Sequence, residues 1–202
     1  MENGTRVESS AEIDLRTMRL RYVGMKPGLL MHNVLSMNPS LVTKSKTAKD
    51  KAENAEQIEA MTYRDENGFL AIPFAAIRRA IIDAGAGYKI GSMGYSGRLS
   101  AAILYPDEDM IPITRNGEYI DEYEIDERAV VVQRARVIRR RPKISYPWEI
   151  EFNIHFDNNV LPPDTASSIF EFAKRSGVIV GLLDFRPNKK GWHGRYEVER
   201  VE

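Results

Sequence analysis

One stretch of strict alternation constrains the fold more than any other part of the sequence. Between residues 148 and 156 every second residue is large and apolar, and the residues between them are polar. The apolar set is Trp148, Ile150, Phe152, Ile154 and Phe156, and the polar set is Glu149, Glu151, Asn153 and His155. Successive side chains of a β-strand point to opposite faces, so this pattern predicts a strand with one buried face.

A concentrated run of positive charge precedes this strand. Its members are Arg134, Arg136, Arg139, Arg140, Arg141 and Lys143. Pro142 and Pro147 flank a short KISY segment and cannot donate to a sheet ladder, so we expect two strands joined by a turn there, with the arginines near the rim. Close positive charges repel unless an anion meets them, and Tyr146 and Trp148 are neighbouring stacking surfaces. The run indicates contact with a phosphate backbone. Alternatively, the arginines pair with the acidic segment upstream or only solubilise a hairpin.

Charge is balanced overall but unevenly distributed. The chain has 29 basic and 29 acidic residues, so net charge alone does not indicate a nucleic-acid binder. Residues 107–127 nevertheless contain nine acidic side chains and a single base, Arg115, directly before the basic run. This asymmetry predicts a molecule with faces of opposite sign.

Several protein classes are excluded or disfavoured by composition. The chain of 202 residues has no cysteine, so it forms neither a disulfide framework nor a thiolate metal site. Its apolar runs are far shorter than the ~20 residues that span a bilayer. Residues 1–12 lack the apolar core of a signal peptide and are expected to be a disordered tail. We expect a cytoplasmic protein with one domain over 13–202 and an insertion at about 34–62.

The order of predicted elements suggests an α+β domain. A first strand is expected over 13–23, a hairpin over 61–73 and a core helix from Phe74 to Gly85. A flexible glycine-rich loop (85–97) and a strand (99–106) follow. After the strand pair described above come a helix that stops at Gly177 and a last strand over 195–201. Residues 43–60 favour a solvated helix whose lysines are available to an anion; they are Lys44, Lys46, Lys49 and Lys51. The expected fold is a ferredoxin-like (RRM-like) antiparallel sheet with two core helices, a charged helical insertion and a long hairpin.

A second basic and aromatic cluster lies near the C-terminus, between an apolar run and the last strand. Its members are Arg186, Lys189, Lys190, Trp192, His193 and Arg195. Pro187, Gly191 and Gly194 shape this loop, and glycine allows a ligand to approach the backbone closely. We expect Trp192 to stack on a base and the lysines to contact phosphates. The alternative is that Trp192 belongs to the core and the lysines are only solvated.

Three segments resemble the RAMP superfamily, the RRM-related proteins that bind guide RNA in CRISPR effector complexes. They are PGLLMHN from Pro27, AIPFAAIRRAIIDAG from Ala71 and VGLLDFRPNKKGWHGRYEV from Val180. The chain is most similar to solitary RAMP-like proteins encoded by bacteriophages. The resemblance implies a ferredoxin-like fold, binding of single-stranded nucleic acid through its backbone, and side-by-side assembly along the strand.

Catalysis has little support in the sequence. The three histidines, His32, His155 and His193, are far apart, and no metal-binding motif is present. The main prediction is a protein that binds single-stranded RNA or DNA, with RNA favoured, without a cofactor and as a homo-oligomer. One alternative is a metal-independent endoribonuclease of the RAMP type, with His32 as its acid–base residue. Another is a phage structural or assembly protein that forms head-to-tail oligomers.

Overall fold

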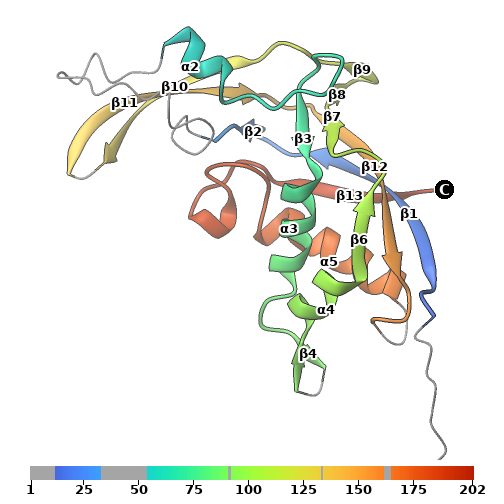
Figure 1. Ribbon diagram of the computed structural model, residues 1–202. Helices are drawn as coiled ribbons and strands as arrows, with labels where there is room; N and C mark the ends of the chain where they lie inside the picture. Colours follow the sequence, from blue (N-terminus) through green and yellow to red (C-terminus); the bar gives the residue numbers. More distant parts are fainter. Residues whose placement is uncertain (1–11, 33–53, 91, 133, 162–164) are drawn as a thin grey trace, which may run out of the picture.

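The structure is a computed structural model that describes residues 12–32, 54–90, 92–132, 134–161 and 165–202 (Figure 1). Within these ranges the protein is α+β with antiparallel sheets, as predicted. The strands are β1 (Leu15–Gly24), β2 (Leu29–Leu30), β3 (Ala71–Pro73), β4 (Lys89–Ile90), β5 (Met93–Gly94), β6 (Ile103–Pro106), β7 (Met110–Pro112), β8 (Thr114–Arg115), β9 (Glu118–Tyr119), β10 (Glu124–Val132), β11 (Ala135–Ile144), β12 (Glu149–Asp157) and β13 (Tyr196–Val201). The helices are α2 (Ala55–Glu59), α3 (Phe74–Ala84), α4 (Tyr95–Ala102), α5 (Thr165–Ile179) and the 3-10 helix η2 (Pro187–Lys189). None of the helices in these ranges has the length and apolar character needed to cross a membrane.

The largest sheet is built around β1 and β12. β1 lies between β13 and β12, and the other edge of β12 pairs with β6 along one part and with β8 along another. The predicted alternation is confirmed, because the five apolar residues of 148–156 are buried. Leu20 and Tyr22 of β1 are buried beside them, whereas Arg19 is exposed. Helices α3, α4 and α5 lie together on one side of this sheet (Figure 1).

The two main helices form where the sequence predicts them. α3 buries Phe74, Ile77 and Ile81 and ends at Gly85, as expected. The prediction that Gly177 stops the second helix is wrong, because α5 continues to Ile179. Gly177 instead lies against β13, where an added Cβ would stand 2.0 Å from the Tyr196 carbonyl oxygen. Close packing between helix and strand, rather than termination, requires a glycine there.

The segment between α3 and β6 differs from its prediction. The sequence predicts a loop to residue 97 and a strand over 99–106. The structure instead has α4 at residues 95–102, and the strand is shortened to Ile103–Pro106. Leu99 and Ala102 are both buried, at a spacing that suits one face of a helix. The glycine-rich loop also contains the short pairing of β4 with β5.

The basic run lies in a hairpin of its own, formed by β10 and β11 and extending away from α3, α4 and α5 (Figure 1). The two strands predicted on either side of the KISY segment are present, with a short connection between Ile144 and Glu149, but they do not pair with each other, because β11 and β12 belong to different sheets. β11 pairs with β10 along one edge and, through Lys143 and Ile144, with β2 along the other. Next to the connection, Lys143 and Ile144 of β11 are paired with β2, and β12 is paired on both edges, so the two strands do not form a ladder with each other there.

Part of the prediction falls outside the described residues. This applies to tail residues 1–11 and to most of the insertion, residues 33–53, including all four of its lysines. The described end of the helix predicted over 43–60 is α2. Its start is fixed by a capping box, in which the Asn54 and Gln57 side chains each accept from the other residue's backbone N–H.

Candidate nucleic-acid interface

Residues 181–195, named here the C-terminal loop, pack against the base of the β10–β11 hairpin. The Asp184 N–H donates to the Leu30 carbonyl of β2 at 2.9 Å, and β2 is itself paired with β11. The Gly194 N–H donates to the Gly28 carbonyl at 2.9 Å. Gly194 has a φ of 72°, and an added Cβ would lie 2.0 Å from the Leu182 carbonyl oxygen, so a side chain at this position would open the loop.

Side chains extend this contact between the two basic segments. Arg141 of β11 donates from Nη1 to Asp184 Oδ2 at 2.5 Å. Arg128 of β10 lies over the Phe185 ring, with its guanidinium carbon 5.7 Å from the ring centroid. Phe185 in turn meets Trp192 edge-to-face at a centroid distance of 4.6 Å. The two basic clusters predicted from the sequence, about 50 residues apart, therefore meet in the structure.

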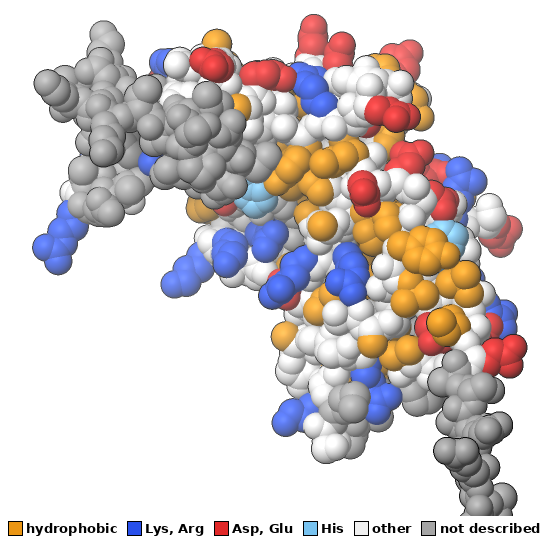
Figure 2. Space-filling view, in the orientation of Figure 1, with side chains coloured by type: hydrophobic (Ala, Val, Ile, Leu, Met, Phe, Trp, Pro, Cys, Tyr) orange, Lys and Arg blue, Asp and Glu red, His pale blue; other side chains and the backbone are white. Residues whose placement is uncertain are grey.

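The C-terminal loop exposes the side chains that the binding prediction requires. Trp192 is 52 % exposed, so the alternative that it belongs to the core is wrong. Lys189, Lys190 and Arg195 are exposed as well. Figure 2 shows Lys and Arg side chains gathered in a band across the face of the molecule that carries this loop and α3.

The arginine run divides into exposed and paired members. Arg134 and Arg136, at the tip of the hairpin, are exposed. Arg140 bonds Glu127 on the neighbouring strand at 2.6 Å, and Lys143 lies 3.6 Å from Glu124. Arg140 and Lys143 therefore pair with the acidic segment upstream, which is the alternative that the sequence analysis gave. Arg139 is partly exposed on the same strand.

Two further predicted contacts flank the loop or lie within it. Tyr146 is exposed, with the Lys26 ammonium 5.7 Å from its ring centroid. Arg186 is partly buried and donates to Asn188 within the loop. Tyr146 is thus accessible to a ligand, whereas Arg186 is held by its hydrogen bond to the Asn188 side chain.

Two predicted contact residues are buried instead. His193 is only 1 % exposed, and Arg141 is committed to Asp184. Burial lowers the pKa of His193, and Arg128 lowers it further, so the ring is neutral near pH 7. His193 and Arg141 therefore support the loop, and their burial does not fit the ligand contact predicted for them.

His32, the acid–base candidate, lies beside the same loop. Its pKa is lowered mainly by burial, and the charges of Asp184 and Arg186 act on it in opposite directions. Its ring meets Tyr63 edge-to-face at 6.4 Å. The structure thus places His32 beside the C-terminal loop, near Asp184 and Arg186.

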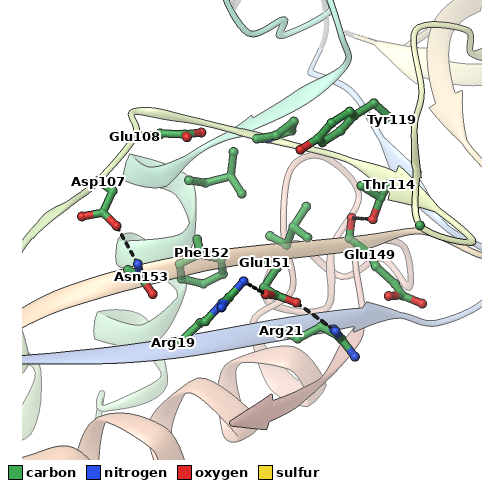
Figure 3. Close-up of a pocket in the computed structure, with 14 residues that line it drawn as sticks. Arg19, Arg21, Asp107, Glu108, Thr114, Tyr119, Glu149, Glu151, Phe152 and Asn153 are labelled. Carbon is green, nitrogen blue, oxygen red and sulfur yellow. Dashed lines mark hydrogen bonds and ion pairs between the residues drawn. The ribbon is translucent and has the colours of Figure 1, made fainter. Parts of the chain in front are cut away.

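The sheet built around β1 and β12, called the central sheet, carries a groove of about 560 Å³ on the face away from α3, α4 and α5. The groove lies between β1, β12 and the 107–119 segment (Figure 3). Its acidic lining includes Asp107, Glu108 and Glu149. The two arginines in it, Arg19 and Arg21, both pair with Glu151. An acidic groove with internally paired arginines is unsuited to a polyanion, and none of the predicted contact residues lines it.

Sequence reasoning missed three residues that shape the interface: Arg128, Asp184 and Phe185. A signal for Asp184 was present, because it is the single acid in a loop with four bases. No local signal indicated the contact between Arg128 and Phe185, since these two residues are far apart in sequence. Comparisons of this chain with protein-family models and with curated protein sequences found no match.

Proposed function

We propose that this protein binds single-stranded nucleic acid, with RNA favoured, along the joined surface of the C-terminal loop and the β10–β11 hairpin. One observation carries the proposal: two basic segments that are far apart in sequence are in contact, and an exposed tryptophan lies on a supporting phenylalanine beside their junction. The hairpin, residues 124–144, has seven bases and three acids, and the loop has four bases and one acid. Both segments are therefore net positive.

The chemistry of this surface suits a single strand. Lys189, Lys190 and the tip arginines supply cations for phosphates, which is the dominant source of affinity for nucleic acids. Trp192 supplies a ring for stacking, and a base is free to stack on a side chain only when it is unpaired. A duplex would use the cations but not the ring.

The fold is consistent with the resemblance noted in the sequence, and we propose a ferredoxin-like arrangement. Strands β13, β1, β12 and β6 lie in that order and are antiparallel. α3 falls between β1 and β6 in the chain, and α5 falls between β12 and β13. The PGLLMHN and C-terminal segments that resemble the RAMP superfamily also meet, through the Gly28–Gly194 hydrogen bond.

A binding assay at two salt concentrations tests the proposal. Single-stranded RNA, single-stranded DNA and duplex of equal length are compared by filter binding at low and moderate salt. Affinity for the single strands should exceed that for the duplex and fall by about 0.7 log units per log unit of salt for each phosphate contact. Binding that is absent, or unchanged by salt, would contradict the proposal.

The position of His32 beside the interface favours one second candidate, a metal-independent endoribonuclease. In that case wild-type protein should cleave RNA in the presence of a chelator, and His32→Ala should abolish cleavage while binding remains. Intact RNA after prolonged incubation with the wild type would exclude this activity.

Assembly along a strand is a further part of the proposal. The acidic groove and the basic interface lie on different faces, so contact between copies is electrostatically favourable in a head-to-tail arrangement. Such growth would produce a filament or a ring.

A further inference from the structure

Asp184 is the exception in a basic loop, and its bonds reach three parts of the molecule. Its Oδ2 accepts from Arg141 of the hairpin at 2.5 Å. Its N–H donates to Leu30 of β2 at 2.9 Å. Its Oδ1 accepts from the N–H of Phe185 at 2.9 Å, and Phe185 supports Trp192. Asp184 thus connects the hairpin to the aromatic pair of the loop.

The backbone around Asp184 adopts a conformation that needs such support. Leu183 and Phe185, its two neighbours, have φ values of 60° and 49°. Residues other than glycine rarely adopt this left-handed conformation, which persists only where surrounding contacts hold it. The contacts that hold it include the burial of Leu183, the Arg128–Phe185 contact and the Asp184–Arg141 pair.

The burial of the ion pair indicates what it contributes. The Arg141 side chain is 10 % exposed and that of Asp184 29 %. A buried ion pair adds little net stability over apolar residues of the same size, but the loss of one partner leaves an uncompensated charge. Such a pair therefore selects one arrangement of the parts that it joins more than it stabilises the fold.

We propose that Asp184 is a positioning residue: through Arg141 it fixes the C-terminal loop against the β10–β11 hairpin, so that one strand of nucleic acid contacts Trp192 and the hairpin arginines together. This inference rests on the proposed function. Two binding sites held at a fixed spacing bind a common strand more tightly than the same sites joined by a flexible connection. Asp184 itself, an acid, makes no favourable contact with phosphate.

The test uses Asp184→Asn, which keeps the shape of the side chain and removes its charge. The matched control is Glu127→Gln, which breaks the exposed Arg140–Glu127 pair on the same hairpin and changes the net charge equally. On charge alone, both substitutions should raise affinity for a polyanion. We expect Glu127→Gln to bind a 20-nucleotide single strand as well as wild type or better, and Asp184→Asn to bind it at least tenfold more weakly.

Two further measurements separate positioning from a general structural role. Hydrogen exchange of loop amides 181–195 should accelerate at least tenfold in Asp184→Asn, while β1 and β12 keep their rates. Adding Trp192→Ala to Asp184→Asn should weaken binding less than twofold further, because Trp192 is already out of place, whereas Trp192→Ala alone should weaken binding about tenfold or more. A merely structural role would leave the contribution of Trp192 intact.

The proposal is overturned if Asp184→Asn binds like Glu127→Gln and its loop stays protected from exchange. If the single variant does not fold, Arg141→Met with Asp184→Asn removes both charges; this pair should fold and show the same loss of the Trp192 contribution, and retention of that contribution would refute the inference. If wild type binds no single strand, the proposed function fails. The exchange rates then test only whether Asp184 fixes the C-terminal loop against the hairpin. Faster exchange in the loop of Asp184→Asn supports this role, and unchanged rates refute it.

Discussion

Trp192→Ala separates a binding role from a folding role at the most exposed aromatic residue of the interface. In the folded protein Trp192 is 52 % exposed, and its closer ring contact is the edge-to-face pair with Phe185, with His193 farther away at a centroid distance of 6.2 Å. Such a pair contributes about 0.5–1.5 kcal/mol. We therefore expect the free energy of unfolding to fall by about 1 kcal/mol, and the thermal midpoint to fall by about 2–4 °C in a chain of this length.

The expected effect on binding is larger. Stacking of a base on an aromatic side chain is worth ~1–3 kcal/mol, and each ~1.4 kcal/mol is a tenfold change in affinity. Trp192→Ala should thus weaken single-strand binding by about one to two orders of magnitude, measured by fluorescence anisotropy of a labelled oligonucleotide. Thermal unfolding of the same samples gives the stability change.

The matched control is Tyr119→Ala on the acidic groove. Tyr119 is 57 % exposed and stacks on Phe69 at a centroid distance of 5.1 Å, so its loss should affect stability to a similar degree and leave affinity unchanged. A Trp192→Ala protein that loses several kcal/mol of stability and keeps full affinity would refute the reasoning. It would mean that the loop presents no stacking surface.

Three other predictions follow from the structure. Gly177→Ala should destabilise the fold strongly in chemical denaturation, since a Cβ at this position overlaps the backbone of β13. Hydrogen bonds from His155 and then Asn153 hold the pKa of Asp107 below its ordinary value of 3.8; the stability that this provides is complete above pH 3.8 and is lost as the pH falls through the lowered value, so Asp107→Asn should flatten the acid side of the stability curve. Light scattering should detect oligomers on addition of a long single strand, and a strict monomer with and without the strand would remove the assembly proposal.

The sequence predicts those elements whose signal lies within their own residues. The alternation at 148–156 predicts β12 and its buried face, and the apolar spacing from Phe74 predicts α3 and its end at Gly85. The Asn116–Gly117 pair is likewise a local turn signal, and both residues have positive φ. In each case a periodicity or a turn residue lies within the element itself.

The remaining features depend on contacts between distant residues. The turn between β10 and β11 was missed because Arg134, with a φ of 67°, stands where a glycine or asparagine would have marked it. The Arg141–Asp184 pair joins residues 43 positions apart, and no periodicity indicates it. His193 and Arg141, which composition alone had assigned to the surface, are both buried.

The way in which the β10–β11 hairpin is attached has an evolutionary consequence. Among the described residues, β2 pairs with Lys143 and Ile144 at the base of the hairpin, Met31 adds one hydrogen bond to Pro142, and the ladder beyond them, out to Val132 and Ala135, continues between β10 and β11. Removal or insertion of one residue pair in each strand preserves the inward and outward alternation of all others. Selection can therefore change the reach of this arm in steps of two residues per strand without altering the packing of the central sheet, and homologues should differ in hairpin length sooner than in the core.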